Sequence, residues 1–246
     1  MIYEATSSAK ERSASRLPSA LGLVLAVVVV EYLARRFALF WLPAIGTLRV
    51  NDMLVTAVAY FGLVGATVPA EQRNPAALGA TLRQVLAEGR RWQPWVAALL
   101  VVGLSLLALV DLLLWGEVRL PVLMSPWRWD AVVLEAAAPV LVPLSVLIVN
   151  GWVIPLAEEW LWRGLIQPSL VGRAGAVAGV LVTSVLFSLK HAIVDASLGR
   201  LLMITAFGLV MGVLALRRGW RASALAHALA NTTASVLALV AGGGQM

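Results

Sequence analysis

Long apolar runs alternate with short polar segments along the chain, beginning near Leu17. Several runs are about 20 residues long, which is the length that an α-helix needs to cross roughly 30 Å of hydrocarbon. We therefore predict about eight membrane-spanning helices, with a margin of one because almost nothing separates the fourth from the fifth. Their approximate bounds are 18–40, 51–68, 94–115, 131–150, 151–168, 174–191, 198–216 and 221–240.

Residues 74–92 follow a different pattern, in which apolar residues recur at helical spacing and charged residues stand between them. The apolar ones are Leu78, Leu82, Val85 and Leu86, and the charged ones are Arg83, Glu88, Arg90 and Arg91. One apolar and one basic face are typical of a helix that lies in the membrane interface. A helix that docks onto a partner is the alternative.

Together the segments predict an all-α polytopic transmembrane bundle in one domain, 17–246, after a polar tail at 1–16. The first apolar run ends in charged residues, so it is expected to be retained and not cleaved as a signal peptide. Within it, Glu31 and Arg35 have the favourable order for an ion pair one helical turn apart. The chain has no internal repeat.

The composition supports a membrane protein, since 61% of the 246 residues are hydrophobic and the mean hydropathy is +0.88. There is no cysteine, which excludes disulfides, thiolate metal sites and cysteine nucleophiles. The net charge of +6 comes mostly from arginines between apolar runs, so we expect contact with membrane lipids and no nucleic acid partner. With eight spans the basic residues divide nine against nine between the two sides, which leaves the orientation open.

The segment Pro155–Gly164 places two adjacent carboxylates and an arginine in an apolar run. Charges near lipid are costly and usually face a bundle interior or a functional cavity. Glu159 and Arg163 are four residues apart, which predicts an ion pair on one helix face. Glu158 lies about 100° round the helix and is expected to be free for other work. An interfacial helix end flanked by belt tryptophans is the alternative.

Only two histidines occur, in the patterns Phe187-x-x-x-His191 and His227-x-x-x-Asn231. Residues four apart share a helix face, so His227 and Asn231 can point into one space. Each histidine could instead pack against a neighbouring helix. The joint occurrence of both histidines, the asparagine and the glutamate pair on late spans favours a site.

This set of residues suits the attack of water on a peptide carbonyl. A carboxylate and a histidine can act as base and proton relay, and a second histidine and an amide can donate hydrogen bonds to an oxyanion. No serine or cysteine nucleophile is indicated. A zinc site of one glutamate with His191 and His227 is an alternative, although the chain has no His-Glu-x-x-His. A proton-coupled transporter and a non-catalytic immunity protein or scaffold are the others.

Three short motifs resemble those of the CPBP family, which includes type II CAAX prenyl endopeptidases and bacteriocin-processing or self-immunity proteins. They are Glu158-Glu159-x-x-x-Arg163, Phe187-x-x-x-His191 and His227-x-x-x-Asn231, in this order within a core of about 151–240. The resemblance implies an intramembrane glutamate-type endopeptidase with no catalytic metal and no cofactor.

Carried over by position, the resemblance implies that Glu158 and His191 activate water and that His227 with Asn231 forms an oxyanion hole. The second glutamate and the arginine of the first motif would support the site. The alanine-, leucine- and arginine-rich composition suggests a bacterial protein of the inner membrane, where prenylated substrates are not expected. We expect a membrane-anchored peptide or protein as substrate.

The late spans contain further small and charged residues that bear on helix packing and on the charge of the site. Gly175-x-x-x-Gly179 and Gly208-x-x-x-Gly212 permit close helix approach. Lys190, directly before the first histidine, could alter the charge of the site, whereas Asp195 is assigned to the next loop. The late spans are therefore expected to enclose a polar, wet pocket within the bilayer.

Overall fold

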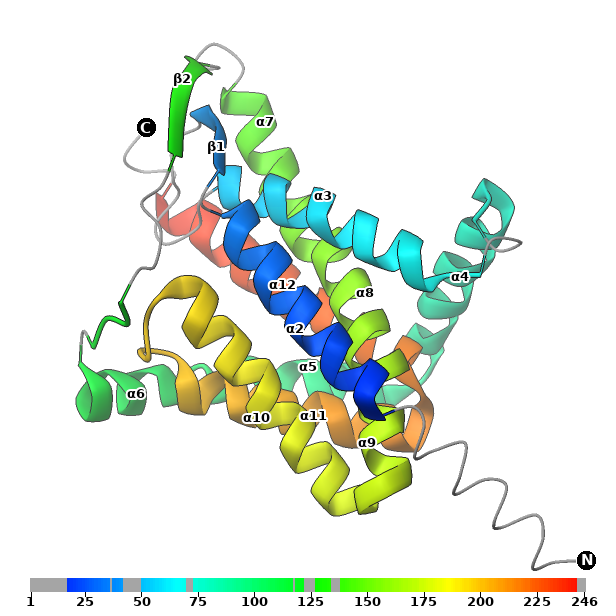
Figure 1. Cartoon of the computed structure of the whole chain (residues 1–246). Coiled ribbons are helices and arrows are strands. Elements are labelled where there is room, and N and C mark those ends of the chain that lie inside the picture. Colours follow the sequence, from blue (N-terminus) through cyan, green and yellow to red (C-terminus); the bar gives the residue numbers. More distant parts are fainter. Residues whose placement is uncertain are drawn as a thin grey trace, which may run out of the picture.

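The computed structural model describes residues 17–35, 37–41, 50–69, 73–116, 118–121, 127–133 and 138–242. The predicted polar tail at 1–16 lies outside these residues. Five helices are long and apolar enough to cross a membrane: Trp92–Trp115, Val140–Ala174, Ala176–Asp195, Leu201–Arg218 and Trp220–Val240. Two shorter apolar helices, Ala20–Ala34 and Asp52–Thr67, pack with them (Figure 1). This arrangement confirms the predicted all-α polytopic bundle.

The first part of the chain forms five α-helices and one short 3₁₀ segment. They are α2 (Leu17–Ala34), α3 (Val50–Thr67), α4 (Pro75–Ala87), η2 (Glu88–Arg90), α5 (Trp92–Leu104) and α6 (Leu107–Trp115). The side chain of Asn74 caps α4 by accepting the Ala77 amide, and Pro75 occupies the first turn, where its missing N–H costs nothing. The predicted amphipathic helix is therefore α4, whose Val85 is fully buried against the start of the last helix.

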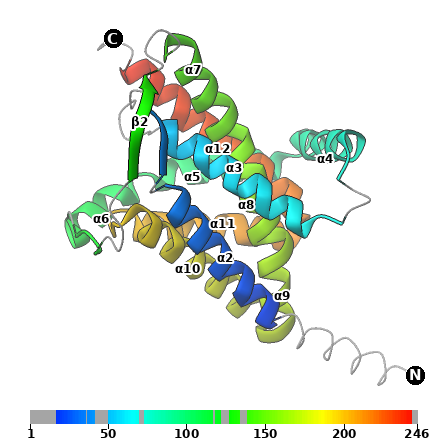
Figure 2. The same cartoon turned by 45° about the horizontal axis from the view of Figure 1, so that its top comes forward.

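The second part contains a single long helix where the sequence predicts the fourth and fifth spans. Its segments are α7 (Ala138–Leu144), η4 (Ser145–Val153), α8 (Ile154–Glu159), η5 (Trp160–Ile166) and α9 (Gln167–Ala174), followed by α10 (Ala176–Asp195), α11 (Leu201–Arg218) and α12 (Trp220–Gly242). Figure 2 shows this helix running from α7 at the top to α9 at the bottom. The predicted boundary at 150–151 is wrong, because nothing there ends the helix.

The long helix accommodates Pro155 between π-helical turns. The segments η4 and η5 are π-helical, and in η4 the amide of Ile154 donates to the carbonyl of Val149, five residues back. In that register the next amide would donate to the Asn150 carbonyl, but Pro155 has no N–H. The freed carbonyl instead accepts the Asn231 side-chain amide at 3.0 Å. The proline thus ties the long helix to α12.

Two short strands accompany the helical bundle. β1 (Phe37–Trp41) and β2 (Trp127–Val133) pair in parallel, with a register shift between Ala38 and Phe40. The sequence predicted helical spans and a headgroup loop for these residues. Their aromatic and β-branched side chains suit an extended backbone, and so short a stretch shows no helical repeat. The first span accordingly ends at Ala34.

The last helix, α12, lies at the centre of the C-terminal bundle and packs against α5, α11, η4 and α8. Its buried positions include five alanines: Ala222, Ala224, Ala226, Ala228 and Ala230. Small side chains let neighbouring backbones approach closely. The same principle applies to Gly208 of α11, where an added Cβ would lie 2.9 Å from the Cβ of Ser184 in α10.

The predicted close approach of glycines is confirmed at three of four positions. A Cβ on Gly212 would lie 2.8 Å from Val180, and one on Gly179 would lie 2.6 Å from Val171. Gly175 instead makes the turn between α9 and α10, with φ of +84°.

Asp111 has a structural role that its sequence context does not reveal. The side chain is completely buried in α6. Its two carboxylate oxygens accept the amides of Leu202 and Met203, each at 2.9 Å. These amides belong to the first turn of α11, so Asp111 caps that helix from a neighbouring one.

Candidate active site

The six predicted site residues come from three helices that pack together. Glu158 and Glu159 end α8, and Arg163 follows in η5. His191 lies near the end of α10, and His227 and Asn231 lie on α12.

Glu159 is held in a closed cluster. One carboxylate oxygen lies 3.3 Å from Nη1 of Arg163 and 3.0 Å from Nδ1 of His227. The other accepts the hydroxyl of Ser223 from α12. Glu159 and Arg163 are completely buried, which confirms the predicted ion pair.

Arg163 has few other polar partners in this interior. Its Nη2 donates to the Gly208 carbonyl at 3.4 Å, and its guanidinium lies 4.5 Å from the ring centre of Phe187. Nε and Nη1 form no hydrogen bond with the described residues. Glu159 is therefore the one carboxylate that compensates this charge among the described residues.

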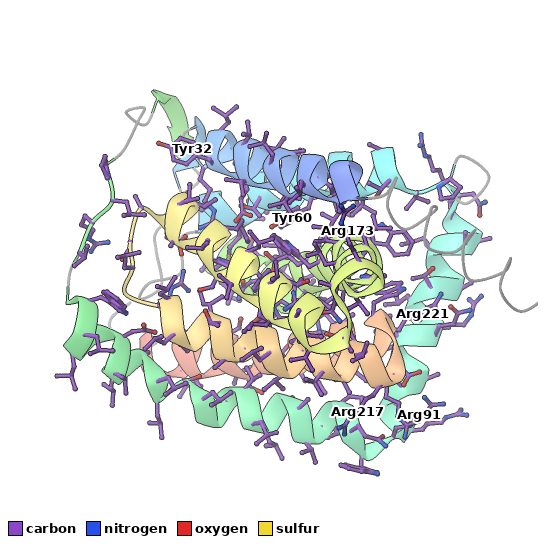
Figure 3. All side chains as sticks on the ribbon, turned by 60° about the horizontal axis from the view of Figure 1, so that its bottom comes forward. Tyr32, Tyr60, Arg91, Arg173, Arg217 and Arg221 are labelled. Atoms are coloured by element: carbon purple, nitrogen blue, oxygen red, sulfur yellow. The ribbon has the colours of Figure 1, made fainter. Side chains whose placement is uncertain are left out.

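Glu158 is also paired, so the expectation that it remains free is wrong. Its Oε1 accepts Lys190 Nζ at 2.8 Å and lies 2.9 Å from the Tyr60 hydroxyl. Lys190 also donates to Glu31 at 3.0 Å, and the Tyr60 hydroxyl lies 2.6 Å from the same Glu31 oxygen. Figure 3 shows Tyr60 in the interior between the α2/α3 pair and α10. Glu31, Tyr60 and Lys190 thus form a buried cluster around Glu158.

The cluster continues to the end of the bundle. Arg35 binds Glu31 at 2.6 Å and Asp195 at 2.7 Å, and Arg200 also pairs with Asp195. Burial lowers the pKa of the Arg35 guanidinium, but Glu31 and Asp195 outweigh it and raise that pKa above its ordinary value. Asp195 is the last residue of α10 and not part of the next loop as predicted, and its partner Arg35 lies directly after α2.

Charges in the two clusters balance. The acidic members are Glu31, Glu158, Glu159 and Asp195, and the basic members are Arg35, Arg163, Lys190 and Arg200. Since the numbers are equal, the two clusters, including the exposed Arg200, carry no net charge when both histidines are neutral. This balance makes their burial tolerable.

Both histidines flank Glu158. His191 Nε2 lies 3.8 Å from Oε1, and His227 Nε2 lies 3.9 Å from Oε2. The His191 ring packs edge-on against Phe187, and the His227 ring packs against Phe207. Nδ1 of His227 can donate to Glu159, and the other nitrogen of the same ring, Nε2, faces Glu158. His191 Nδ1 has no hydrogen-bond partner among the described residues.

Asn231 lies one turn beyond His227, as predicted, but its amide is already engaged. Nδ2 donates to the Asn150 carbonyl that Pro155 leaves free. An amide nitrogen carries two hydrogens, so one remains for another acceptor.

The site is a closely packed polar interior. The Glu158 side chain is 5% exposed and that of His191 is 16% exposed. Two grooves of about 560 and 610 Å³ lie elsewhere, between α5 and α11, and no predicted site residue lines them. Within the described part of the chain, no group of three or more His, Cys, Asp or Glu residues has a metal-binding arrangement.

Sequence reasoning missed Tyr60 and Glu31 as neighbours of Glu158. Glu31 carried a signal, because it is a carboxylate inside an apolar run. Lys190 carried the same signal next to the histidine. Tyr60 carried none, since a tyrosine in an apolar helix is unremarkable without the structure.

Residues 140–233 match the family model described as type II CAAX prenyl endopeptidase Rce1-like. The matched segment contains all six predicted site residues. No curated protein and no solved structure matches the chain. The match and the apolar helices together indicate an integral multi-pass membrane protein similar to membrane CAAX-type endopeptidases. The match confirms the predicted resemblance to the CPBP family over residues 140–233.

Proposed function

We propose that the protein is an intramembrane endopeptidase that hydrolyses a peptide bond of a membrane-associated substrate. The observation that carries this proposal is the placement of Glu158 between two histidines, with both Nε2 atoms within 4 Å of its carboxylate. A carboxylate and an imidazole in a nearly closed interior are suited to take a proton from water.

The proposed reaction begins with water held between Glu158 and His191. The water oxygen attacks the peptide carbonyl carbon while its proton passes to the Glu158–His191 pair. The carbonyl oxygen becomes an oxyanion, which His227 and Asn231 stabilise by hydrogen bonds. The C–N bond then breaks as the proton passes to the leaving nitrogen.

Glu159 and Arg163 support the reaction in this scheme without touching the substrate. Because Glu159 accepts from Nδ1 of His227, only a protonated His227 ring can also offer an Nε2–H to the oxyanion. The contact between the Glu159 carboxylate and Nδ1 also fixes the orientation of the His227 ring.

A glutamate-type reaction is favoured over the zinc alternative by one feature. Lys190 Nζ lies 2.8 Å from Oε1 of Glu158, the oxygen that also lies nearest to His191. An ammonium at that distance repels a divalent cation and occupies a lone pair of the carboxylate. We therefore propose that no metal takes part.

The proposed substrate is a lipidated or C-terminally anchored peptide or protein in a bacterial inner membrane. This part of the proposal rests on the apolar surroundings of the site and on the family. Membrane lipids are the other expected partners.

Mass spectrometry of cleavage products tests the proposal. Purified protein in detergent or proteoliposomes would be incubated with lipidated and unlipidated membrane peptides. Glu158→Gln is the inactive variant, and Thr233→Ala, exposed on the same helix as Asn231, is the matched control. We expect defined products with the wild type and the control only. Equal products with Glu158→Gln, or loss of all products on chelation with rescue by zinc, would contradict the proposal.

A further inference from the structure

The two oxygens of Glu158 have different surroundings. Oε1 is bound by Lys190 and lies within hydrogen-bonding distance of Tyr60. Oε2 lies 3.9 Å from His227 Nε2 and accepts no hydrogen bond from the residues described. One oxygen is therefore anchored, and the other is available to a water molecule.

Lys190 has a fixed position because three groups surround its ammonium. Besides Glu158, it contacts Glu31 at 3.0 Å and the Tyr60 hydroxyl at 3.2 Å. The Lys190 side chain is completely buried. A lysine that is buried in this way needs a carboxylate, and here it has two.

The ion pairs show which cation compensates which carboxylate. Arg35 compensates Glu31, and Lys190 remains to compensate Glu158. A buried carboxylate without a neighbouring cation is costly. Lys190 is therefore the group that compensates Glu158 in this interior.

We propose that Lys190, Tyr60 and Glu31 are positioning residues for Glu158. They fix Oε1 and compensate the charge of the carboxylate, so that Oε2 is the oxygen available to water. Glu31 lies on α2 and Tyr60 lies on α3, both outside the segment that matches the family. The N-terminal helices thus complete the site. This inference rests on the proposed function.

The test compares variants of the full chain in the peptide assay across pH 5 to 9. Lys190→Met alone would leave Glu158 and Glu31 facing each other and could unfold the protein. The double variant Glu31→Gln/Lys190→Met removes one charge of each sign and is the better probe. We expect it to remain folded, to lose about a hundredfold in kcat with KM retained, and to show a pH profile that differs from that of the wild type.

Two single variants refine the test. Tyr60→Phe keeps all charges and is expected to lower kcat roughly tenfold, the factor for one hydrogen bond to a charged group. Lys190→Arg keeps the cation and should retain more activity than the double variant. Gly172→Ala, exposed near the end of α9, is the matched control.

The outcomes separate the two proposals. If the wild type cleaves and Glu158→Gln does not, but the double variant keeps the wild-type rate and pH profile, the positioning inference is wrong. A loss of melting temperature with an unchanged pH profile of the folded fraction also overturns it. If no peptide is cleaved by the wild type, the proposed function itself fails.

A second, independent inference concerns the arginines at the two ends of the bundle. At one end, Trp160 donates to Thr67 at the end of α3 and packs on Trp220 at the start of α12. This end, called the basic end, carries Arg73, Arg83, Arg90, Arg91, Arg173, Arg217, Arg218 and Arg221. Figure 3 shows Arg91, Arg217 and Arg221 together on its right side.

The opposite end has fewer cations among the described residues: Arg35, Arg119, Arg128 and Arg200. Two of them, Arg35 and Arg200, are paired with Asp195. At the basic end Arg91 is paired with Glu88. The sequence predicted an even division of basic residues between the two sides of the membrane. This division does not hold, because the predicted fourth and fifth spans are one helix. Every later loop therefore lies on the side opposite to the predicted one.

We infer that the basic end faces the cytoplasm and contacts the anionic headgroups of that leaflet. Short loops rich in arginine are retained on the cytoplasmic side of a membrane. The amphipathic α4, which carries Arg83 and exposes Leu78 and Leu82, lies at the same end and suits the interface.

Cysteine labelling tests the orientation cleanly, because the chain has no cysteine of its own. Ala174→Cys lies at the basic end and Val118→Cys at the other, and both positions are exposed. In intact spheroplasts we expect a membrane-impermeant maleimide to label Val118→Cys at once and Ala174→Cys only after permeabilisation. The reverse pattern, or equal labelling of both, would overturn the inference.

Discussion

The two adjacent glutamates differ in where their partners come from. Glu159 contacts Arg163, Ser223 and His227, all within residues 140–233, the segment that matches the family. Glu158 is held by Lys190 from that segment and by Tyr60 from outside it. Glu159 is thus held entirely within the matched segment, whereas Glu158 is held partly by a side chain from outside it.

The clusters also differ in how they end. The Glu159 cluster is closed, with every charged member buried. The Glu158 cluster continues through Glu31 and Arg35 to Asp195, which is 17% exposed. A closed ion pair tolerates no loss of one partner, whereas a chain of pairs that reaches the surface can adjust at its far end. We therefore expect Glu159 to matter for stability and Glu158 for reaction.

The largest effects on the cleavage rate are expected for variants of the two histidines, which should differ in stability. His191→Ala removes a ring whose Nδ1 binds no described residue, so the fold should persist while kcat falls about 10²- to 10⁴-fold. His227→Ala should lower the rate and also the melting temperature, because Glu159 loses a donor. Thermal unfolding and peptide cleavage measured on the same samples check this. An active His191→Ala would remove that residue from the reaction.

Glu159→Gln is expected to be the most destabilising single change at the site. It leaves the buried charge of Arg163 without a carboxylate, which costs about 3–5 kcal/mol. The melting temperature should fall by roughly 10 °C for a chain of this size. Glu159→Leu combined with Arg163→Met should be tolerated better than either change alone. A single variant as stable as the wild type would show that the pair is not needed.

Asp195→Asn tests the far end of the Glu158 cluster and should have a small effect. Arg35 and Arg200 lose a partner there, but both remain partly exposed to water. We expect a loss of about 1 kcal/mol or less and a rate within a factor of two of the wild type. A loss as large as that of Glu159→Gln would contradict the difference between the clusters.

Removal of metal ions should have no effect. EDTA or 1,10-phenanthroline, added to the cleavage assay, is expected to leave the rate of the wild type unchanged. Lys190 already binds Oε1 of Glu158, and its positive charge repels a divalent cation at this carboxylate. Inhibition that added zinc reverses would replace the glutamate mechanism with a metal-dependent one.

The sequence was informative where a local repeat decides the structure. Apolar runs predicted the helices, and the spacing of Glu159 and Arg163 predicted their ion pair, because both depend on contacts within one helix. The continuity across Asn150 was not predictable, since it depends on π-helical turns and on the Asn231 amide from another helix.

Contacts between distant segments account for the other errors. The spacing of Glu158 relative to Arg163 suggested that the Glu158 carboxylate is free. Spacing along one helix cannot reveal that Lys190 and Tyr60, from two other helices, contact this carboxylate. Nor could it reveal that Asp111 caps α11, since the partner amides are about 90 residues away along the chain. The motif residues themselves were found because their positions repeat a short pattern.

The most direct test of the central claim compares Glu158→Gln and Glu159→Gln by rate and by melting temperature of the same preparations. Glu158→Gln should lose cleavage by about 10²- to 10⁴-fold and keep most of its thermal stability. Glu159→Gln should lose thermal stability first, with its remaining folded fraction still cleaving. If Glu158→Gln cleaves normally while folded Glu159→Gln is inactive, the roles assigned to the two glutamates are reversed.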